Sequence, residues 1–115
     1  MADKYAILQL QETGETARER FMSLSYLREH GMEPNPEHYD LVYTANLTGE
    51  SLEELFILFN TVDMPKGFAG HAMSTSDIVA VIKEGLTTGY FYCDSIGFKP
   101  LPGFQHRLVE HLREE

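Results

Sequence analysis

Basic side chains are scarce in this chain and unevenly placed. The 115 residues include nine Lys and Arg against eighteen Asp and Glu, which gives a formal net charge of −9. No Lys or Arg lies between Arg28 and Lys66. Because such an excess of negative charge repels phosphates, we expect no direct binding of nucleic acid. The acidic stretch has two interpretations: a solvated face that maintains solubility, or a surface suited to a basic partner.

Cysteine is nearly absent, and long apolar runs are missing. Cys93 is the single cysteine and cannot form an internal disulfide, so the fold must depend on its core, as is typical of a reducing compartment. No apolar run approaches the roughly 18 residues of a membrane span. The first residues lack the basic-then-apolar layout of a secretory signal, so we expect a cytoplasmic protein. The length and the 43% hydrophobic content fit one domain over residues 1–115.

Hydrophobic periodicity predicts four strands and three helices. The expected strands are residues 4–11, 39–45, 78–82 and 90–93, and the expected helices are residues 16–31, a short helix from 51, and 103–114. The order is β-α-β-α-β-β-α. This order predicts an α+β fold with one small mixed or antiparallel sheet and helices packed against it.

Local motifs define the helix ends and the core-facing positions. Thr16-x-x-Glu19 and Ser51-x-x-Glu54 are capping boxes that we expect to open the first two helices, and Gly31 is expected to end the first. The side chains expected to face the core are Phe21, Leu24 and Leu27 in the first helix, Leu52, Leu55, Phe56 and Phe59 in the second, Phe104, Leu108 and Leu112 in the last, and Tyr39, Leu41 and Tyr43 on one face of the second strand.

The densest cluster of reactive residue types is the segment GHAMSTSD, residues 70–77. A hydrolase would use Ser74 or Ser76 as nucleophile, His71 as base, and Asp77 or Asp94 to orient the base. The chain has no nucleophile elbow and no recognisable triad spacing. Ser and Asp just before a strand also form turns through bonds to local amides. We therefore expect a structural role for this segment and no enzymatic activity, with the hydrolase as an alternative.

Metal and cofactor motifs are missing. The candidate metal ligands are His71, Cys93, His106 and His111. His106 and His111 are five residues apart, about 140° around a helix, so they do not share one face. There is no Cys-x-x-Cys, no His-Glu-x-x-His and no phosphate-binding glycine loop. We expect no metal and no cofactor.

Two sequence blocks together resemble a known family. The blocks are GHAMSTSDIVAV, residues 70–81, and YFYCDSIGFKPLPGF, residues 90–104. In the YodL-like domain family the corresponding blocks read Gly-His-Ser-Leu-Ser-x-Ser-Asp-Val and Tyr-Tyr-x-Asp-Ser-x-Gly-Phe. The segments YAILQL, RFMSLSYLREHG, YDLVYTANL and LEELFILFN also follow the order of the family. The resemblance therefore covers about residues 5–104, and Ala72, Met73 and Cys93 depart from the pattern in ways that fit packing roles.

The second block is expected to mark the fold rather than an active site. Gly97 permits the turn after the strand, Asp94 and Ser95 bond free amides of the turn, and Phe98 fills the core. The resemblance to the family also implies a setting, because its members resemble accessory proteins of mobile elements in Firmicutes.

That setting selects two binding hypotheses. The first is an anti-defence protein, an acidic inhibitor that occupies the basic nucleic-acid-binding surface of a nuclease, restriction enzyme or CRISPR effector. The alternative is an accessory or scaffold module that binds another protein of the same element through apolar residues around Met64 and Phe68. Under the first hypothesis the partner-binding residues are Glu33, Glu37, Asp40, Glu50, Glu53, Glu54 and Asp63.

Overall fold

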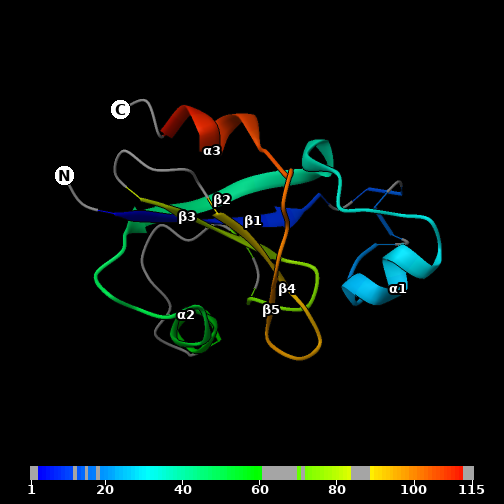
Figure 1. Cartoon of the computed structure of the whole chain (residues 1–115), viewed down its shortest axis with the longest axis horizontal. Coiled ribbons are helices and arrows are strands. Elements are labelled where there is room, and N and C mark those ends of the chain that lie inside the picture. Colours follow the sequence, from blue (N-terminus) through cyan, green and yellow to red (C-terminus); the bar gives the residue numbers. More distant parts are fainter. Residues whose placement is uncertain are drawn as a thin grey trace.

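A five-stranded antiparallel sheet with helices on both faces organises the chain (Figure 1). The structure is a computed structural model and describes residues 3–11, 13, 14, 16, 17, 19–60, 70, 72–83 and 89–112. The strands are β1 (Lys4–Leu10), β2 (Tyr39–Asn46), β3 (Ile78–Ile82), β4 (Gly89–Cys93) and β5 (Phe98–Pro100), in the spatial order β2-β1-β3-β4-β5. The helices are α1 (Leu24–Glu29), α2 (Leu52–Leu58), α3 (Arg107–Leu112) and the 3-10 turn η1 (Pro36–His38).

The predicted α+β class is confirmed, and the predicted elements follow one another in the expected order. The structure adds η1 and the short strand β5, which pairs with β4. Among the described residues, no helix combines the length and the apolar character that a membrane span needs.

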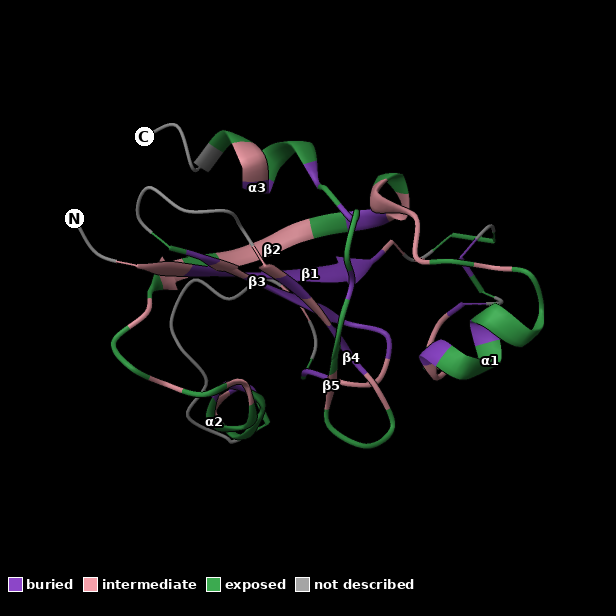
Figure 2. Cartoon of the chain, in the orientation of Figure 1, coloured by how far each residue is buried: buried purple, intermediate pink, exposed green. Residues whose placement is uncertain are grey.

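Two apolar layers lie on opposite faces of the sheet, and buried residues concentrate in its central strands (Figure 2). In β1, Ala6 and Leu8 point to one face, while Tyr5 and Ile7 point to the other, because side chains alternate along a strand. The first face is covered by α1 and α3. The second is covered by α2, which lies on the opposite side of the sheet from α3 in Figure 1. Burial on both faces explains why β1 and β3 read as nearly continuous apolar runs.

The first helix is much shorter than predicted. It begins at Leu24 with Ser23 as its N-cap, and the described residues 16, 17 and 19–21 lie in turns. The Thr16 hydroxyl donates to the carbonyls of Gln11 and Thr13 and does not cap a helix. Phe21 has φ 64, a left-handed conformation that a right-handed helix cannot contain, and its side chain is 58% exposed. The predicted core role of Phe21 is therefore wrong.

The C-terminal end of α1 agrees with the prediction. Gly31 has φ 71, and the amide of Met32 donates to the carbonyl of Leu27 over 2.7 Å. This is the geometry in which a glycine in the left-handed region ends a helix.

A β-bulge in β2 overturns the predicted single face of Tyr39, Leu41 and Tyr43. Leu8 pairs with Leu41 and Ile7 pairs with Tyr43, so Val42 is the extra residue. Tyr39 and Leu41 pack in the layer under α1 and α3, whereas Tyr43 packs in the layer under α2. One inserted residue moves every later side chain to the other face, because the side-chain period of a strand is two.

The second helix begins where the sequence predicts, but only some of the side chains predicted to face the core are buried. Both bonds of the Ser51–Glu54 capping box are present, and Leu55 and Phe59 are buried. Phe56, expected in the core, is exposed. The apolar stripe of α2 is therefore narrower than predicted.

The last helix begins at Arg107, four positions later than expected, after a Pro102–Gly103 turn. Phe104 is buried as predicted, but Val109 occupies the core position and Leu108 is 45% exposed. The inward face of α3 is therefore at Val109 and not at Leu108. The side chain of Leu112 lies outside the described residues.

Candidate functional site

The predicted partner-binding residues lie at the two ends of β2. Glu33, Glu37 and Asp40 precede or open the strand, and Glu50, Glu53 and Glu54 follow it, at the start of α2. A strand of eight residues spans roughly 25 Å at about 3.3 Å per residue, so the two groups form separate surfaces. Asp63 lies outside the described residues. We call the first group the η1 acids and the second the α2 acids.

Most of these carboxylates have no basic partner in the part of the chain that the structure describes. Glu33 pairs with Arg28, whose Nε lies 3.0 Å from Oε1. Among the residues that the structure describes, no Lys or Arg forms an ion pair with Glu37, Asp40 or the α2 acids. The guanidinium of Arg20 binds the carbonyl of Gln11 instead. The negative charge of this part of the sequence is therefore also present on the folded surface.

Two of the α2 acids have local structural roles. Glu50 accepts hydrogen bonds from the amide and the hydroxyl of Thr48, at 2.7 and 2.8 Å. These bonds, the side-chain one first, favour the charged form and lower the pKa of Glu50. Glu54 closes the capping box of α2. Glu53 is exposed and makes no such bond to a described residue, so it is the residue of this group that we consider available to contact a partner.

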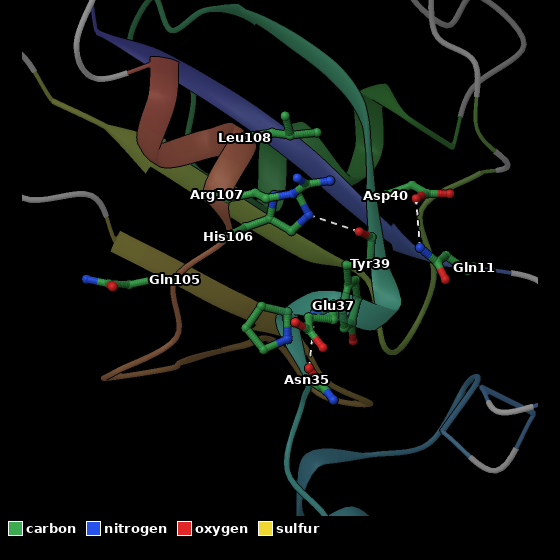
Figure 3. A pocket seen from close by; sticks show the side chains of 10 residues that line it. Gln11, Asn35, Glu37, Tyr39, Asp40, Gln105, His106, Arg107 and Leu108 are labelled. Atoms are coloured by element: carbon green, nitrogen blue, oxygen red, sulfur yellow. Dashed lines mark hydrogen bonds between the residues drawn. The ribbon is translucent and has the colours of Figure 1, made fainter.

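The η1 acids border a pocket of about 720 Å³, which Figure 3 shows. Three segments far apart in sequence meet there: the end of β1, the turn η1 with the start of β2, and the segment entering α3. The lining residues are Gln11, Asn35, Pro36, Glu37, Tyr39, Asp40, Gln105, His106, Arg107 and Leu108.

Polar groups around the pocket hold one another in place. The amide nitrogen of Gln11 donates to Oδ1 of Asp40 over 3.1 Å, and the side chain of Asn35 accepts the backbone N–H of Glu37 over 3.0 Å. The carboxylate of Glu37 has no such bond to a described residue and is exposed. The pocket thus has one oriented carboxylate, one free carboxylate and the guanidinium of Arg107.

His106 is a buried side chain of the pocket, with 5% exposure. Its Nε2 lies 2.9 Å from the backbone oxygen of Tyr39, and its backbone N–H donates to the hydroxyl of Tyr90. Because a carbonyl only accepts, Nε2 carries the hydrogen of this bond. Nδ1 has no hydrogen-bond partner among the described residues.

The residues proposed for hydrolysis are held in structural bonds instead. Asp77 is buried, and its Oδ2 accepts the side-chain N–H of Gln9 at 3.0 Å and the amide of Ser74 at 2.9 Å. Asp94 accepts the amides of Leu24 and Ser95, at 3.2 and 2.8 Å. His71, the proposed base, lies outside the described residues.

The two family-like blocks also fix the chain before α1. The side-chain oxygen of Ser76, which is itself at φ 89, accepts the amide of Phe21 over 3.1 Å. The hydroxyl of Tyr92 donates to the carbonyl of Met22 over 2.7 Å. Together with the bond from Leu24 to Asp94, these contacts place α1 against the sheet. These residues of the two blocks therefore have a structural role: they hold α1 against the sheet.

The candidate metal ligands gain no support from the geometry: the described residues contain no cluster of three or more His, Cys, Asp or Glu side chains placed to hold an ion. Cys93 is buried. Burial, and then the charges of Asp77 and Asp94, raise the pKa of its thiol to about 12. Cys93 is thus a small core residue and a poor nucleophile near neutral pH.

Sequence reasoning identified Glu37 and Asp40 but missed the rest of the pocket. His106 was considered only as a metal ligand, and Arg107, Gln11 and Asn35 carried no motif. Their spacing gives no signal, because the register of β1 with β2 and the position of α3 bring them together.

The protein is a small α+β domain with an antiparallel sheet. Polar side chains of the two family-like blocks hold the first helix against this sheet. The family model of the YodL-like domain matches residues 4–104, so the chain belongs to the YodL-like domain family. No curated protein matches the chain. No solved structure matches it either.

Proposed function

We propose that this YodL-like domain is a non-catalytic protein that binds a partner with a basic surface. In this proposal it is the anti-defence protein of a mobile element and competes with nucleic acid for the binding groove of a nuclease, restriction enzyme or CRISPR effector. A lysine- and arginine-lined groove attracts exposed carboxylates as it attracts phosphates.

The observation that supports this proposal is that several exposed acids form no ion pair within the part of the chain that the structure describes. Within the described residues, Glu37, Asp40 and Glu53 are exposed and form no ion pair. Unpaired carboxylates keep their long-range attraction for a basic surface, whereas paired ones largely cancel. The η1 acids and the α2 acids would contact two separate parts of such a groove.

Competition for DNA provides the test. A fluorescent DNA duplex is bound to a type II restriction endonuclease or to an RNA-guided CRISPR nuclease, and the full chain is added at several salt concentrations. We expect displacement at about 50 mM salt that weakens by about tenfold or more at 200 mM, since screening and competing ions weaken charge contacts. Displacement that does not depend on salt, or none with any effector tested, contradicts the proposal.

Charge variants assign the contact surface. Glu53→Gln removes one charge from the α2 acids, and Glu37→Gln removes one from the η1 acids. Neither side chain is bonded to another described residue. Each change is expected to weaken displacement by about two- to fivefold, in line with one charge contact. The matched control is Glu29→Gln, which removes an equal charge from the exposed end of α1.

A second candidate function follows from exposed apolar side chains on α2. Phe56 and Ile57 are 36% and 63% exposed on the helix that carries the α2 acids. Exposed apolar groups next to charge are typical of protein-binding surfaces, which supports a scaffold module for a protein of the same element. Met64 and Phe68, the residues first expected at such a surface, lie outside the described residues. A pull-down from cells that carry the element tests this function: loss of capture by Ile57→Ser, with Glu37→Gln unaffected, supports it.

A further inference from the structure

Strand β2 is an outer strand of the sheet, and its edge is less protected than that of the other outer strand, β5. In the spatial order β2-β1-β3-β4-β5, the one described strand that pairs with β2 is β1. Figure 2 shows the consequence: β1 is buried along most of its length, while most of β2 is partly or fully exposed. Shortness, proline and lysine protect outer strands from further pairing. Strand β5 has three residues and contains Lys99 and Pro100, whereas β2 has eight residues and contains neither residue type.

The hydrogen-bond pattern shows which backbone groups of β2 point away from β1. Directly after the strand, the amide of Leu47 donates to the carbonyl of Asp3. Hydrogen-bonded and non-bonded pairs alternate along an antiparallel ladder, and the register is regular over Tyr43–Asn46. The N–H and C=O groups of Thr44 and Asn46 therefore point outward. Both residues are exposed.

A contact at the start of β2 supports this count. The amide of Gln11 donates to the carbonyl of His38, so the backbone groups of the next residue, Tyr39, point outward. The carbonyl of Tyr39 accepts a hydrogen bond from Nε2 of His106, which lies outside the sheet. A donor therefore already occupies this part of the edge. Among the residues that the structure describes, no comparable donor reaches the outward groups after the bulge.

From this edge we infer that the stretch Tyr43–Asn46 binds an extended basic segment of the partner protein as an additional strand. In strand addition, backbone hydrogen bonds supply affinity and alternate side chains supply the fit. Tyr43 and Ala45 pack against the layer under α2, so apolar residues at alternate positions of the added strand would extend that layer. The inference rests on the proposed function, because the partner with a basic surface provides the segment.

Charge selects a basic segment as the occupant. The chain runs from β2 into the α2 acids, and Glu53 among them is exposed. A second copy of the chain is the competing occupant, and charge opposes it, because each copy has a net charge of −9. Pairing of β2 with the same strand of another copy would also bring together the acids that flank both strands. A segment with lysine or arginine residues meets a favourable field instead.

The experiment uses the ¹⁵N-labelled full chain and the peptide acetyl-Lys-Lys-Val-Thr-Val-Lys-Lys-amide, which has a β-forming centre and lysines at both ends. The amides of Tyr43 and Ala45 bond to β1 and should exchange slowly with solvent in the free chain, whereas those of Thr44 and Asn46 should exchange fast. At a concentration of about ten times its Kd, the peptide should slow exchange at Thr44 and Asn46 by about tenfold.

Two matched peptides separate strand pairing from charge. One carries N-methyl groups on its three central amides, and the other has glutamate in place of every lysine. Each should bind at least about tenfold more weakly, because the first loses backbone hydrogen bonds and the second loses the charge complementarity. Equal binding of the N-methylated peptide would overturn strand addition. Equal binding of the glutamate peptide would overturn the basic occupant.

Variants of the chain locate the site. Thr44→Pro removes one outward N–H at an edge position that tolerates proline, and it should weaken the lysine peptide by at least about tenfold. Thr44→Val keeps the N–H and loses the same hydroxyl, so its affinity should be unchanged. The N-methylated peptide decides the question if Thr44→Pro does not fold. Glu53→Gln should weaken the lysine peptide by about two- to threefold, and Glu29→Gln, at the exposed end of α1, should have no effect.

The outcomes also separate this inference from the proposed function. If the lysine peptide does not bind while DNA displacement persists, strand addition fails and the basic-partner function stands. If the peptide slows exchange at Thr44 and Asn46 while no effector releases its DNA, strand addition holds and the competition function fails. Light scattering tests the competing occupant: a dimer of the free chain with slow exchange at the same two amides would overturn the inference.

Discussion

The backbone amide of Phe21 donates a hydrogen bond to the side-chain oxygen of Ser76 over 3.1 Å, and both residues have positive φ, 64 and 89. Left-handed backbone costs a non-glycine residue about 1–2 kcal/mol, so two such residues persist only where their surroundings favour them. The hydrogen bond links these two backbone conformations. Phe21 ends the turn segment before α1. Ser76 lies just before β3, and its amide donates to the carbonyl of Cys93.

The first prediction concerns this contact. Ser76→Ala removes the acceptor of the Phe21 amide but keeps the strained backbone, so we expect the free energy of unfolding to fall by about 1–2 kcal/mol. Ser76→Gly also removes the acceptor but relieves the strain at φ 89, and should therefore cost less than Ser76→Ala. Urea unfolding of both variants measures the difference. Equal losses would contradict the contribution of strain.

The second prediction concerns the buried carboxylate of Asp77. Asp77→Ala leaves the side-chain N–H of Gln9 and the amide of Ser74 without their acceptor, at a cost of about 2–4 kcal/mol. Asp77→Asn keeps one oxygen that can accept both bonds and should recover at least half of that loss. Thermal unfolding by circular dichroism checks the order. An Asn variant as unstable as the Ala variant would show that the charge of Asp77, and not its bonding position, stabilises the fold.

The third prediction follows from the bulge at Val42. Deleting Val42 leaves the pairs Leu8–Leu41 and Ile7–Tyr43 intact, because Val42 is the residue without a partner in β1. We therefore expect a folded variant destabilised by about 1–3 kcal/mol, mainly through the loss of the partly buried valine side chain. Thr44, by contrast, pairs with Ala6 of β1. Its deletion removes a paired residue and moves Ala45 to the other face of the sheet. Its unfolding transition should be far lower or absent, and a Thr44 deletion as stable as the Val42 deletion would refute the register.

The fourth prediction concerns alkaline pH. Burial raises the pKa of Tyr5 and of Cys93, each to about 12, and also raises the pKa values of Tyr39 and Tyr92. The unfolded chain therefore releases these protons at lower pH than the folded chain. Their contribution to stability is fully present below the ordinary values of 9.0 for the thiol and 10.0 for tyrosine, and is lost as pH rises toward the folded values.

The melting temperature should accordingly fall steadily above about pH 9, and the fall should be less steep in Cys93→Ala, which removes one of the four groups. Alkylation of Cys93 by iodoacetamide at pH 8 offers an independent measurement. It should be slow in the folded protein and fast in guanidinium chloride, since only the thiolate reacts. Rapid alkylation of the folded chain would contradict the burial of the thiol.

Local patterns predicted the strands well and the first helix poorly. The apolar runs of β1 and β3 identify buried strands because both of their faces are covered. Thr16 and Glu19 have the spacing of a capping box, yet Glu19 faces His38 over 2.8 Å and the Thr16 hydroxyl binds carbonyls. Contacts with residues outside the segment therefore override its helix signal.

For the candidate pocket, too, the sequence indicated some of the residues and not the others. Glu37 and Asp40 stand out in the sequence because the stretch around them has no basic residue. His106 joins them only because its ring reaches the backbone oxygen of Tyr39, 67 positions earlier in the chain. A sequence pattern of local spacing cannot indicate such a contact.

The sequence by itself determined the α+β class, the strand order along the chain, the YodL-like family and the excess of negative charge, because periodicity, block motifs and composition are local or additive properties. Only the tertiary structure decided that the acids divide between the two ends of β2, that Val42 turns Tyr43 to the other face, and that His106 and Arg107 share a pocket with Asp40. These features depend on strand register and helix docking, which are set by packing between distant segments.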